Sequence, residues 1–160
     1  MEGMSRVREE DHMMIYTIAF AALLPWVPVL ADDAPARAHL IGVWQQLDDS
    51  GKGVSIWVVE TKGNSLHITN SQEDQKLSEI ECNPTGAECD GTVSGKKAKV
   101  VMYYNGPTLV ELETVGSDVV KRQFTVTEQP DMMEIAVMAI TGNAKSETLH
   151  LKRMPSTTSR

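Results

Sequence analysis

The sequence predicts an all-β domain built as an antiparallel up-and-down barrel. Across residues 98–153, short apolar runs follow one another, and each is broken by a turn signal: Asn105-Gly106-Pro107, Gly116-Ser117-Asp118, Gln129-Pro130-Asp131 and Gly142-Asn143. Such runs with turn chemistry between them are typical of consecutive hairpins, and no long segment has helical spacing of its apolar residues. Two packed sheets or one barrel would bury these runs, and consecutive hairpins favour the barrel because it leaves no edge strand.

The first half of the chain adds further apolar runs, which brings the candidate strands to about nine. These runs lie at 40–47, 54–61, 65–70 and 77–82. Turn-forming residues separate the first three of them, at 48–53 and at 62–64. With 160 residues, the chain is long enough for one domain of this kind.

Alternation along each strand predicts which side chains point into the barrel. In 108–115, Val110 and Leu112 share the apolar face, so Glu111 and Glu113 are expected on the solvent side. In 119–127, Arg122 shares its face with apolar residues, which puts a cation on the core side, where it must be paired or reach solvent. Either its head extends to the rim of the barrel, or it anchors the carboxylate of a fatty-acid-type ligand.

Two further side chains complete the expected ligand site beside Arg122. Phe124 lies on the same face of its strand, and Met133 lies on the apolar face of 132–140. Trp57 alternates with the more apolar face of its strand, so it is expected to face outward or to line a rim.

The apolar run at residues 13–31 predicts a secretory signal. It ends in Val29-Leu30-Ala31, with small residues at the two sites that a signal peptidase reads, so cleavage is expected after Ala31. Pro25 and Pro28 disfavour a membrane-spanning helix, and an uncleaved N-terminal anchor is the alternative. The expected organisation is a signal at 1–31, a flexible lead at 32–38, the barrel at 39–154 and a disordered tail at 155–160. The expected location is periplasmic or secreted.

Cys82 and Cys89 are the only cysteines of the chain. In an oxidising compartment we expect them to form a disulfide, with two free thiols as the alternative. Two cysteines without a nearby histidine do not complete a zinc site, so no metal is expected.

Composition and motifs argue against several classes of function. The net charge of -7 disfavours nucleic acid, because phosphate binding needs a basic surface. The sequence has no nucleophile elbow, phosphate loop or dinucleotide fingerprint, and none of its 4 histidines has metal-binding spacing. We therefore expect no enzyme, no catalytic residue and no cofactor.

The first predicted strand contains Gly42-Val43-Trp44, which resembles the G-x-W motif that opens lipocalins and their calycin relatives. In that family, the tryptophan plugs the closed end of the barrel and a basic residue of the last strand packs over it. The resemblance implies a barrel of about eight strands that binds small apolar molecules. It also implies that Arg153 stacks on Trp44, while Gly42 lets the backbone come close. Small periplasmic protease inhibitors share this opening strand, a similar barrel and one disulfide.

Together, these patterns favour a non-enzymatic periplasmic or secreted protein that holds a small apolar or amphipathic ligand inside a barrel. The alternative is a protein–protein module such as a hydrolase inhibitor, suggested by the short lead and the stapled loop. The expected partner is a small hydrophobic ligand or, for the alternative, a protein. Nucleic acid and a stable membrane span after signal cleavage are not expected. An interior cavity of ~300 Å³ or more would favour the ligand.

Overall fold

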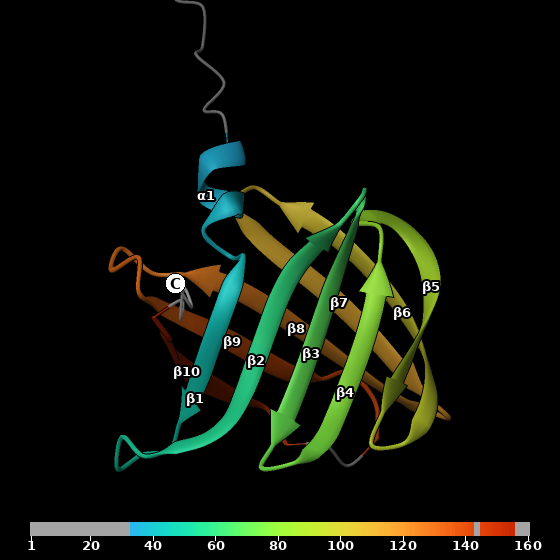
Figure 1. The fold of residues 1–160 in the computed structure, drawn as a ribbon. Coiled ribbons are helices and arrows are strands. Elements are labelled where there is room, and N and C mark those ends of the chain that lie inside the picture. The colour runs from blue at the N-terminus through green and yellow to red at the C-terminus, as the bar shows by residue number, and fades with distance from the viewer. Residues whose placement is uncertain (1–32, 143–144, 156–160) are drawn as a thin grey trace, which may run out of the picture. The chain divides into compact units, whose positions relative to one another are not determined.

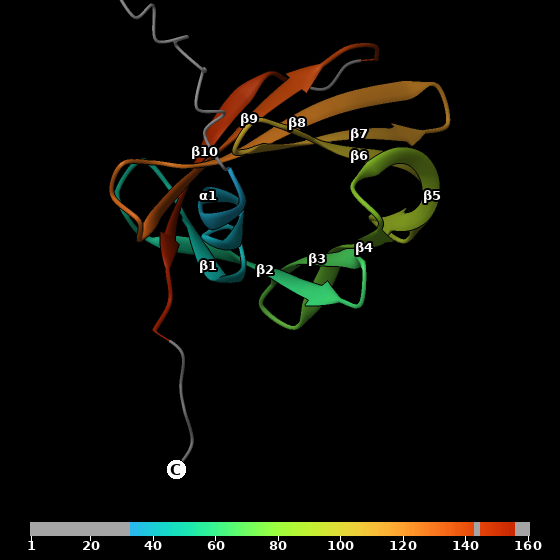
Figure 2. The same ribbon diagram turned by 90° about the horizontal axis from the view of Figure 1, so that it is seen from above.

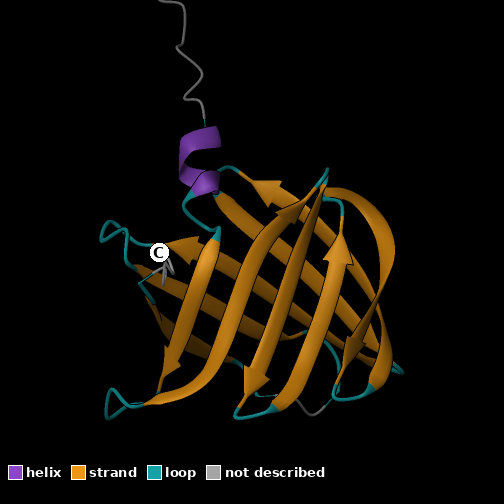
Figure 3. Ribbon diagram, viewed as in Figure 1, coloured by secondary structure: helices purple, strands orange, loops and turns teal. Residues whose placement is uncertain are grey.

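The computed structural model describes residues 33–142 and 145–155, which all belong to one unit of the chain, Ala31–Arg160. The expected signal at 1–31 and residues 156–160 of the expected tail lie outside the described part. One short helix precedes ten strands (Figure 1, Figure 3). The elements are α1 (Ala34–Ala38), β1 (Gly42–Leu47), β2 (Gly53–Lys62), β3 (Ser65–Gln72), β4 (Gln75–Cys82), β5 (Thr85–Val93), β6 (Lys96–Asn105), β7 (Thr108–Val115), β8 (Asp118–Val126), β9 (Met132–Ala139) and β10 (Glu147–Arg153).

Each strand pairs antiparallel with the next along the chain, and β10 pairs with β1. The sheet therefore closes into an up-and-down barrel, whose ring of strands is seen end-on in Figure 2. The predicted architecture is confirmed, but the expected number of about eight strands is wrong, because the barrel has ten. The strand that the apolar runs did not predict is β5, which is mostly exposed and has only a weakly apolar inward face, where Cys89 and Val93 pack against the core.

Tight two-residue turns set the register between neighbouring strands. Between β7 and β8, Gly116 has a φ of 63°, a conformation that glycine adopts without steric cost. This turn pairs Val115 with Asp118, and the ladder then places Glu111 directly opposite Arg122. Residues that are directly opposite in a sheet share a face, so both side chains must point the same way.

The strand β7 consequently has the opposite phase from the predicted one. Glu111 is 1% exposed and Glu113 is 4% exposed, and both lie inside the barrel rather than in solvent. Strand β7 has apolar residues on both of its faces, so alternation alone did not decide its orientation. The inward charge of Arg122 on β8 decides it, because a buried cation needs carboxylates beside it.

The outward placement of Trp57 is also wrong. Its side chain is 4% exposed, and its ring packs edge-to-face on Phe124 at a centroid distance of 5.9 Å. Strand β2 is apolar on both faces, and the face that contains Ser55, Trp57 and Val59 is the buried one. A large aromatic ring gains more from burial than the smaller side chains of the other face.

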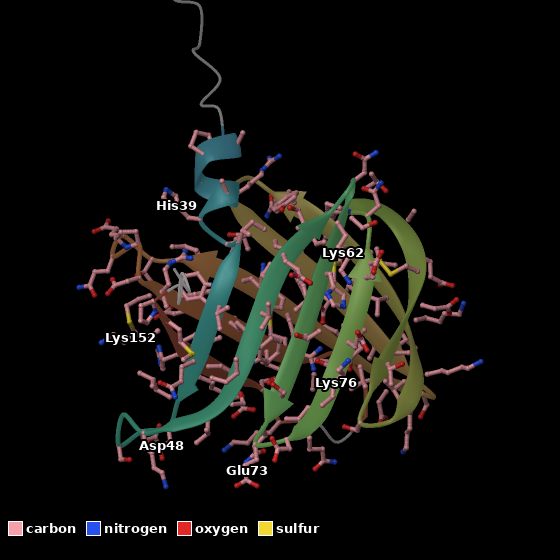
Figure 4. The ribbon with its side chains drawn as sticks, in the orientation of Figure 1. His39, Asp48, Lys62, Glu73, Lys76 and Lys152 are labelled. Carbon is pink, nitrogen blue, oxygen red and sulfur yellow. A yellow bond between two sulfur atoms is a disulfide. The ribbon has the colours of Figure 1, made fainter. Side chains whose placement is uncertain are left out.

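The end of the barrel that carries α1, here called the closed end, is filled by side chains. Trp44 is 0% exposed, and its indole Nε1 donates to the carbonyl of Leu40 at 3.0 Å. The guanidinium of Arg153 lies 4.1 Å from the Trp44 ring centroid, as the resemblance implies. A Cβ at Gly42 would collide with Arg153 Nη1, so this position needs a glycine. Lys62 lies at this end, whereas Asp48 and Glu73 lie at the opposite end, here called the mouth (Figure 4).

Helix α1 covers part of the closed end (Figure 1, Figure 2). Arg37 attaches it: its Nε donates to the carbonyl of Gly106 at 2.9 Å, and its guanidinium lies 4.6 Å from the ring centroid of Tyr104. Most of the lead that the sequence predicts to be flexible therefore forms a helical turn in contact with the turn between β6 and β7.

A disulfide joins Cys82, at the end of β4, to Cys89 in β5, with their Cα atoms 5.8 Å apart. This confirms the predicted pairing. The ladder between β4 and β5 contains only three residue pairs, from Ser78↔Val93 to Ile80↔Gly91. The disulfide thus links the two strands on the closed-end side, beyond the point where their backbone pairing stops.

Candidate functional site

A cavity of about 290 Å³ opens at the mouth of the barrel, and we call it the mouth cavity. Its walls combine apolar side chains with a few polar ones, as in sites for small amphipathic molecules. The lining residues are Gln46, Trp57, Asn70, Leu77, Ser78, Val93, Ser94, Arg122, Val137, Glu147 and Leu149. They come from β1 to β5, from the turn after β5 and from β8 to β10, so the cavity is the open part of the barrel interior.

Behind one wall of the mouth cavity lies a buried group of three charges, Arg122, Glu111 and Glu113, which we call the internal charge cluster. Arg122 Nη1 donates to Glu111 Oε1 at 2.8 Å and to Glu113 Oε2 at 2.5 Å. The arginine side chain is 17% exposed and lines the cavity, whereas the glutamate side chains are only 1% and 5% exposed. The cluster is thus an ion-paired network that presents its cation to the cavity.

Burial dominates the ionisation of the cluster. It raises the pKa of Glu111 above its usual value, and the nearby charge of Glu113 adds to this, although Arg122 acts in the opposite direction. Burial also disfavours the charged guanidinium, yet the two carboxylates outweigh this and hold the pKa of Arg122 above its ordinary value. Arg122 therefore stays charged, while Glu111 binds a proton more readily than a glutamate in water.

Neutral hydrogen bonds organise the wall nearest β1 and β2. Gln46 Oε1 accepts from Ser55 Oγ at 2.8 Å and from Trp57 Nε1 at 3.2 Å. Both donors belong to inward-facing residues of β2, and Gln46 lies on the neighbouring strand. The amide thereby fixes the orientation of the Trp57 indole, which forms an apolar wall of the cavity.

The structure separates the three residues expected around a ligand. Arg122 lines the mouth cavity. Phe124 and Met133 are both 0% exposed, lie in the core cluster and are not in the cavity wall. Phe124 instead supports the cavity indirectly, through its edge-to-face contact with Trp57.

Sequence reasoning missed Glu111, Glu113 and Asn70 as interior residues. For the glutamates, a signal was present: a two-residue turn at Gly116-Ser117 places Glu111 opposite Arg122, so an inward arginine implies an inward glutamate. For Asn70 a signal was also present, because it lies in phase with Leu66 and Ile68, the buried apolar residues of β3.

The other features of the described residues give no comparable site. Larger hollows of about 550, 450 and 360 Å³ are also present, but their linings are mostly polar or exposed; Asp48, Asp49 and Gly51 line the first of them, against the turn between β1 and β2. Across 33–142 and 145–155, no group of three or more histidine, cysteine, aspartate or glutamate side chains is arranged to hold a metal ion. In the same residues, no helix has the length and apolar character needed to cross a membrane.

No protein-family model and no curated protein matches the chain. Several solved structures do. The Schistosoma mansoni fatty acid binding protein in complex with arachidonic acid superposes with a TM-score of 0.61 at 15% identity, over 75% of this chain and 99% of that one. The REP1-NXSQ fatty acid transporter gives 0.59 at 20% identity, over 74% and 98%. Secretory abundant heat soluble protein 4 from Ramazzottius varieornatus gives 0.57 at 15% identity, over 72% and 94%.

These likenesses establish the fold. The chain forms a closed ten-stranded up-and-down barrel, the fold also seen in fatty-acid-binding and secretory abundant heat soluble proteins. The barrel implied by the resemblance, and the stacking of Arg153 on Trp44, are therefore confirmed. The lipocalin-like barrel of about eight strands is corrected, because this barrel has ten strands and the solved structures similar to it are fatty-acid-binding and secretory abundant heat soluble proteins.

Proposed function

We propose that this protein is a non-enzymatic binding protein that holds a small apolar or amphipathic molecule in the mouth cavity. The observation that carries the proposal is the cavity itself, with the Trp57 ring, Val137 and Leu149 in its walls and a buried charged group at its back. Apolar walls with a few fixed polar groups are what bind and orient such ligands.

The size of the cavity restricts the ligand. Its volume of about 290 Å³ lies just below the range of roughly 300–1,000 Å³ for small-molecule sites, and so just below the size expected to favour a ligand. The closed half of the barrel is occupied by side chains such as Trp44, Met102 and Leu109, each 0% exposed. The proposed ligand is thus short, or extends partly out of the mouth. The names of the structural neighbours, a fatty acid transporter and a fatty acid binding protein, support binding rather than a reaction.

The inhibitor alternative has less support. A protein-binding surface beside the stapled loop would need an apolar patch there. Among the described residues, the exposed large hydrophobic side chains are Val43, Ile140 and Met154, which belong to β1 or follow β9 and β10. None of them lies on β4 or β5, the strands that the disulfide joins.

Native mass spectrometry of protein purified from its own source tests the proposal, with a bound small-molecule mass as the expected result. A matched pair of variants locates the ligand. Val137→Phe fills the mouth cavity and should abolish binding of the ligand and of a fluorescent apolar probe. Met138→Phe adds a ring on the other face of the same strand and should leave binding unchanged. A clean ligand-free mass together with no probe binding would contradict the proposal.

We further propose that the protein is exported and acts in a periplasm or outside the cell. The apolar run at 13–31 and the Cys82–Cys89 disulfide both support this location, because disulfides persist in oxidising compartments. Sequencing the N-terminus of the natural protein should give a chain that starts at Asp32. A chain that retains residues 1–31 would contradict signal cleavage.

A further inference from the structure

Inside the barrel, some buried hydrogen-bond acceptors have no donor beside them. The donors Ser55 Oγ and Trp57 Nε1 are both engaged by Gln46. Two buried acceptors have no hydrogen-bond partner within the described chain, namely Asn70 Oδ1 and Glu111 Oε2. An unpartnered buried acceptor is costly, and it is normally satisfied by a water or a ligand. Among the described residues, these two buried acceptors thus remain open to a donor.

Around the mouth cavity and the internal charge cluster, carboxylates outnumber cations. Arg122 Nη1 is already bound by Glu111 and Glu113, so two carboxyl groups lie beside the single guanidinium before any ligand arrives. Glu147 also lines the cavity and adds a further carboxylate near the entrance. A ligand carboxylate would have to compete with two buried carboxylates for one guanidinium, and like charges close together in a buried site repel strongly.

From these two observations we propose that the mouth cavity selects an apolar molecule whose polar end donates hydrogen bonds and carries no negative charge. An aliphatic alcohol or amine has this chemistry, and a fatty acid carboxylate does not. Asn70 lines the cavity and its buried Oδ1 is the acceptor left for the ligand, while the glutamates compete with an anion for Arg122. This inference rests on the proposed function and specifies the ligand class of the same site.

Three ligands with the same alkyl chain test the inference on the purified protein: decanol, decylamine and decanoate, each titrated at neutral pH against a displaceable fluorescent probe. We expect decanol and decylamine to bind at least about ten-fold more tightly than decanoate. Decanoate binding as tightly as the other two would overturn the inference and leave the proposed function standing. Failure of all three to bind, with no probe binding either, would contradict both.

A matched pair of double variants tests the role of the glutamates. Glu111→Gln/Glu113→Gln removes the competing carboxylates and should raise decanoate affinity at least about ten-fold, because Arg122 becomes available to the ligand. Glu81→Gln/Glu134→Gln makes the same change of net charge on the outer surface and should leave all three affinities unchanged. An unchanged ligand ranking in the first variant, with a native circular dichroism spectrum, would overturn the inference.

Asn70→Leu keeps the test decisive if the double variant does not fold. It removes the acceptor at the cavity wall but keeps a side chain of similar size. Decanol and decylamine should then bind about five-fold more weakly or worse, since one hydrogen bond to the ligand is lost, while decanoate binding changes little. Equal weakening of all three ligands would instead indicate a change in cavity shape and would count against the proposed role of Asn70.

Discussion

Arg153 and Arg122 occupy opposite halves of the barrel, and their partners differ in kind. At the closed end, the Arg153 guanidinium stacks on Trp44 and donates to the backbone carbonyls of His39 and Ile41. Near the mouth, Arg122 is held by two buried carboxylates and faces a cavity. The backbone carbonyls and the aromatic ring that hold Arg153 do not titrate. The carboxylates that hold Arg122 do, so the charge of that site depends on pH and affects the binding of a charged ligand.

The contrast separates a structural end from a ligand-binding end. At the closed end, the polar side chains of this arrangement already have partners within the barrel. Trp44 Nε1 donates to the carbonyl of Leu40, and the guanidinium of Arg153 fills the space beside Gly42. At the mouth, two acceptors remain without partners and space is left for a small molecule. We therefore expect substitutions at the closed end to act on stability, and substitutions at the mouth to act on binding and on pH dependence.

The largest expected effect is that of Trp44→Ala. Emptying a site of this size that is 0% exposed should lower the free energy of unfolding by about 3–5 kcal/mol. Trp57→Ala provides the comparison at the mouth and should cost clearly less, because its ring already borders a cavity and makes fewer contacts on that side. Urea unfolding of both variants measures the difference. Equal losses would contradict the division between a filled end and an open one.

The disulfide should have the next largest effect. Replacing Cys82 and Cys89 by serine should reduce the free energy of unfolding by about 2–3 kcal/mol, since a closed loop of this length restricts the unfolded chain. Alkylation of the native protein without reductant should label neither cysteine. Full labelling, or a double-serine variant with unchanged stability, would show that the closed end does not depend on this covalent link.

Arg153→Ala should cost about 1–2 kcal/mol, through loss of the contact with the Trp44 ring and of the bonds to carbonyls. The emission maximum of Trp44 should also shift, because a cation leaves the face of its indole. Arg153→Lys keeps the charge but loses the planar fork, so an intermediate loss of stability is expected. If the emission and the stability of the alanine variant were both unchanged, Arg153 would not stabilise the closed end.

The smallest expected effect is a pH-dependent one at the mouth. Because burial raises the pKa of Glu111, its contribution to stability is fully present below the pKa of the unfolded chain, near 4.5, and is lost as pH rises through the folded value. Glu111→Gln resembles the protonated form and leaves Arg122 paired with Glu113. Its melting temperature should exceed that of the wild type at pH 7–8 and converge with it near pH 4.5.

Melting curves of both proteins across this pH range measure the effect. Glu134→Gln serves as the control, since this glutamate is on the outer surface and is half exposed. A Glu111→Gln variant that is less stable at neutral pH, by an amount that grows with pH, would reverse the expected sign. It would then follow that the charged form of Glu111 is the one that the folded barrel favours.

Sequence alone determined the features that depend on local chemistry. Turn residues such as Gly116 and Gly106 mark hairpins because they adopt positive φ, and alternation then predicts strands wherever one face is apolar. The pairing of Cys82 with Cys89 and the inward direction of Arg122 and Phe124 also followed from these patterns, and the structure agrees with both.

Tertiary structure decided the features that depend on which strands meet. Strand β5 is mostly exposed and its apolar face is short, with Cys89 and Val93 packed against the core, so its pairing with β4 and β6 is what makes it a strand and raises the count to ten. Strands β2 and β7 are apolar on both faces, so the orientation of Trp57, Glu111 and Glu113 depends on their neighbours across the barrel. The size of the mouth cavity depends on the closure of all ten strands and on how far each side chain reaches inward, which no single strand encodes.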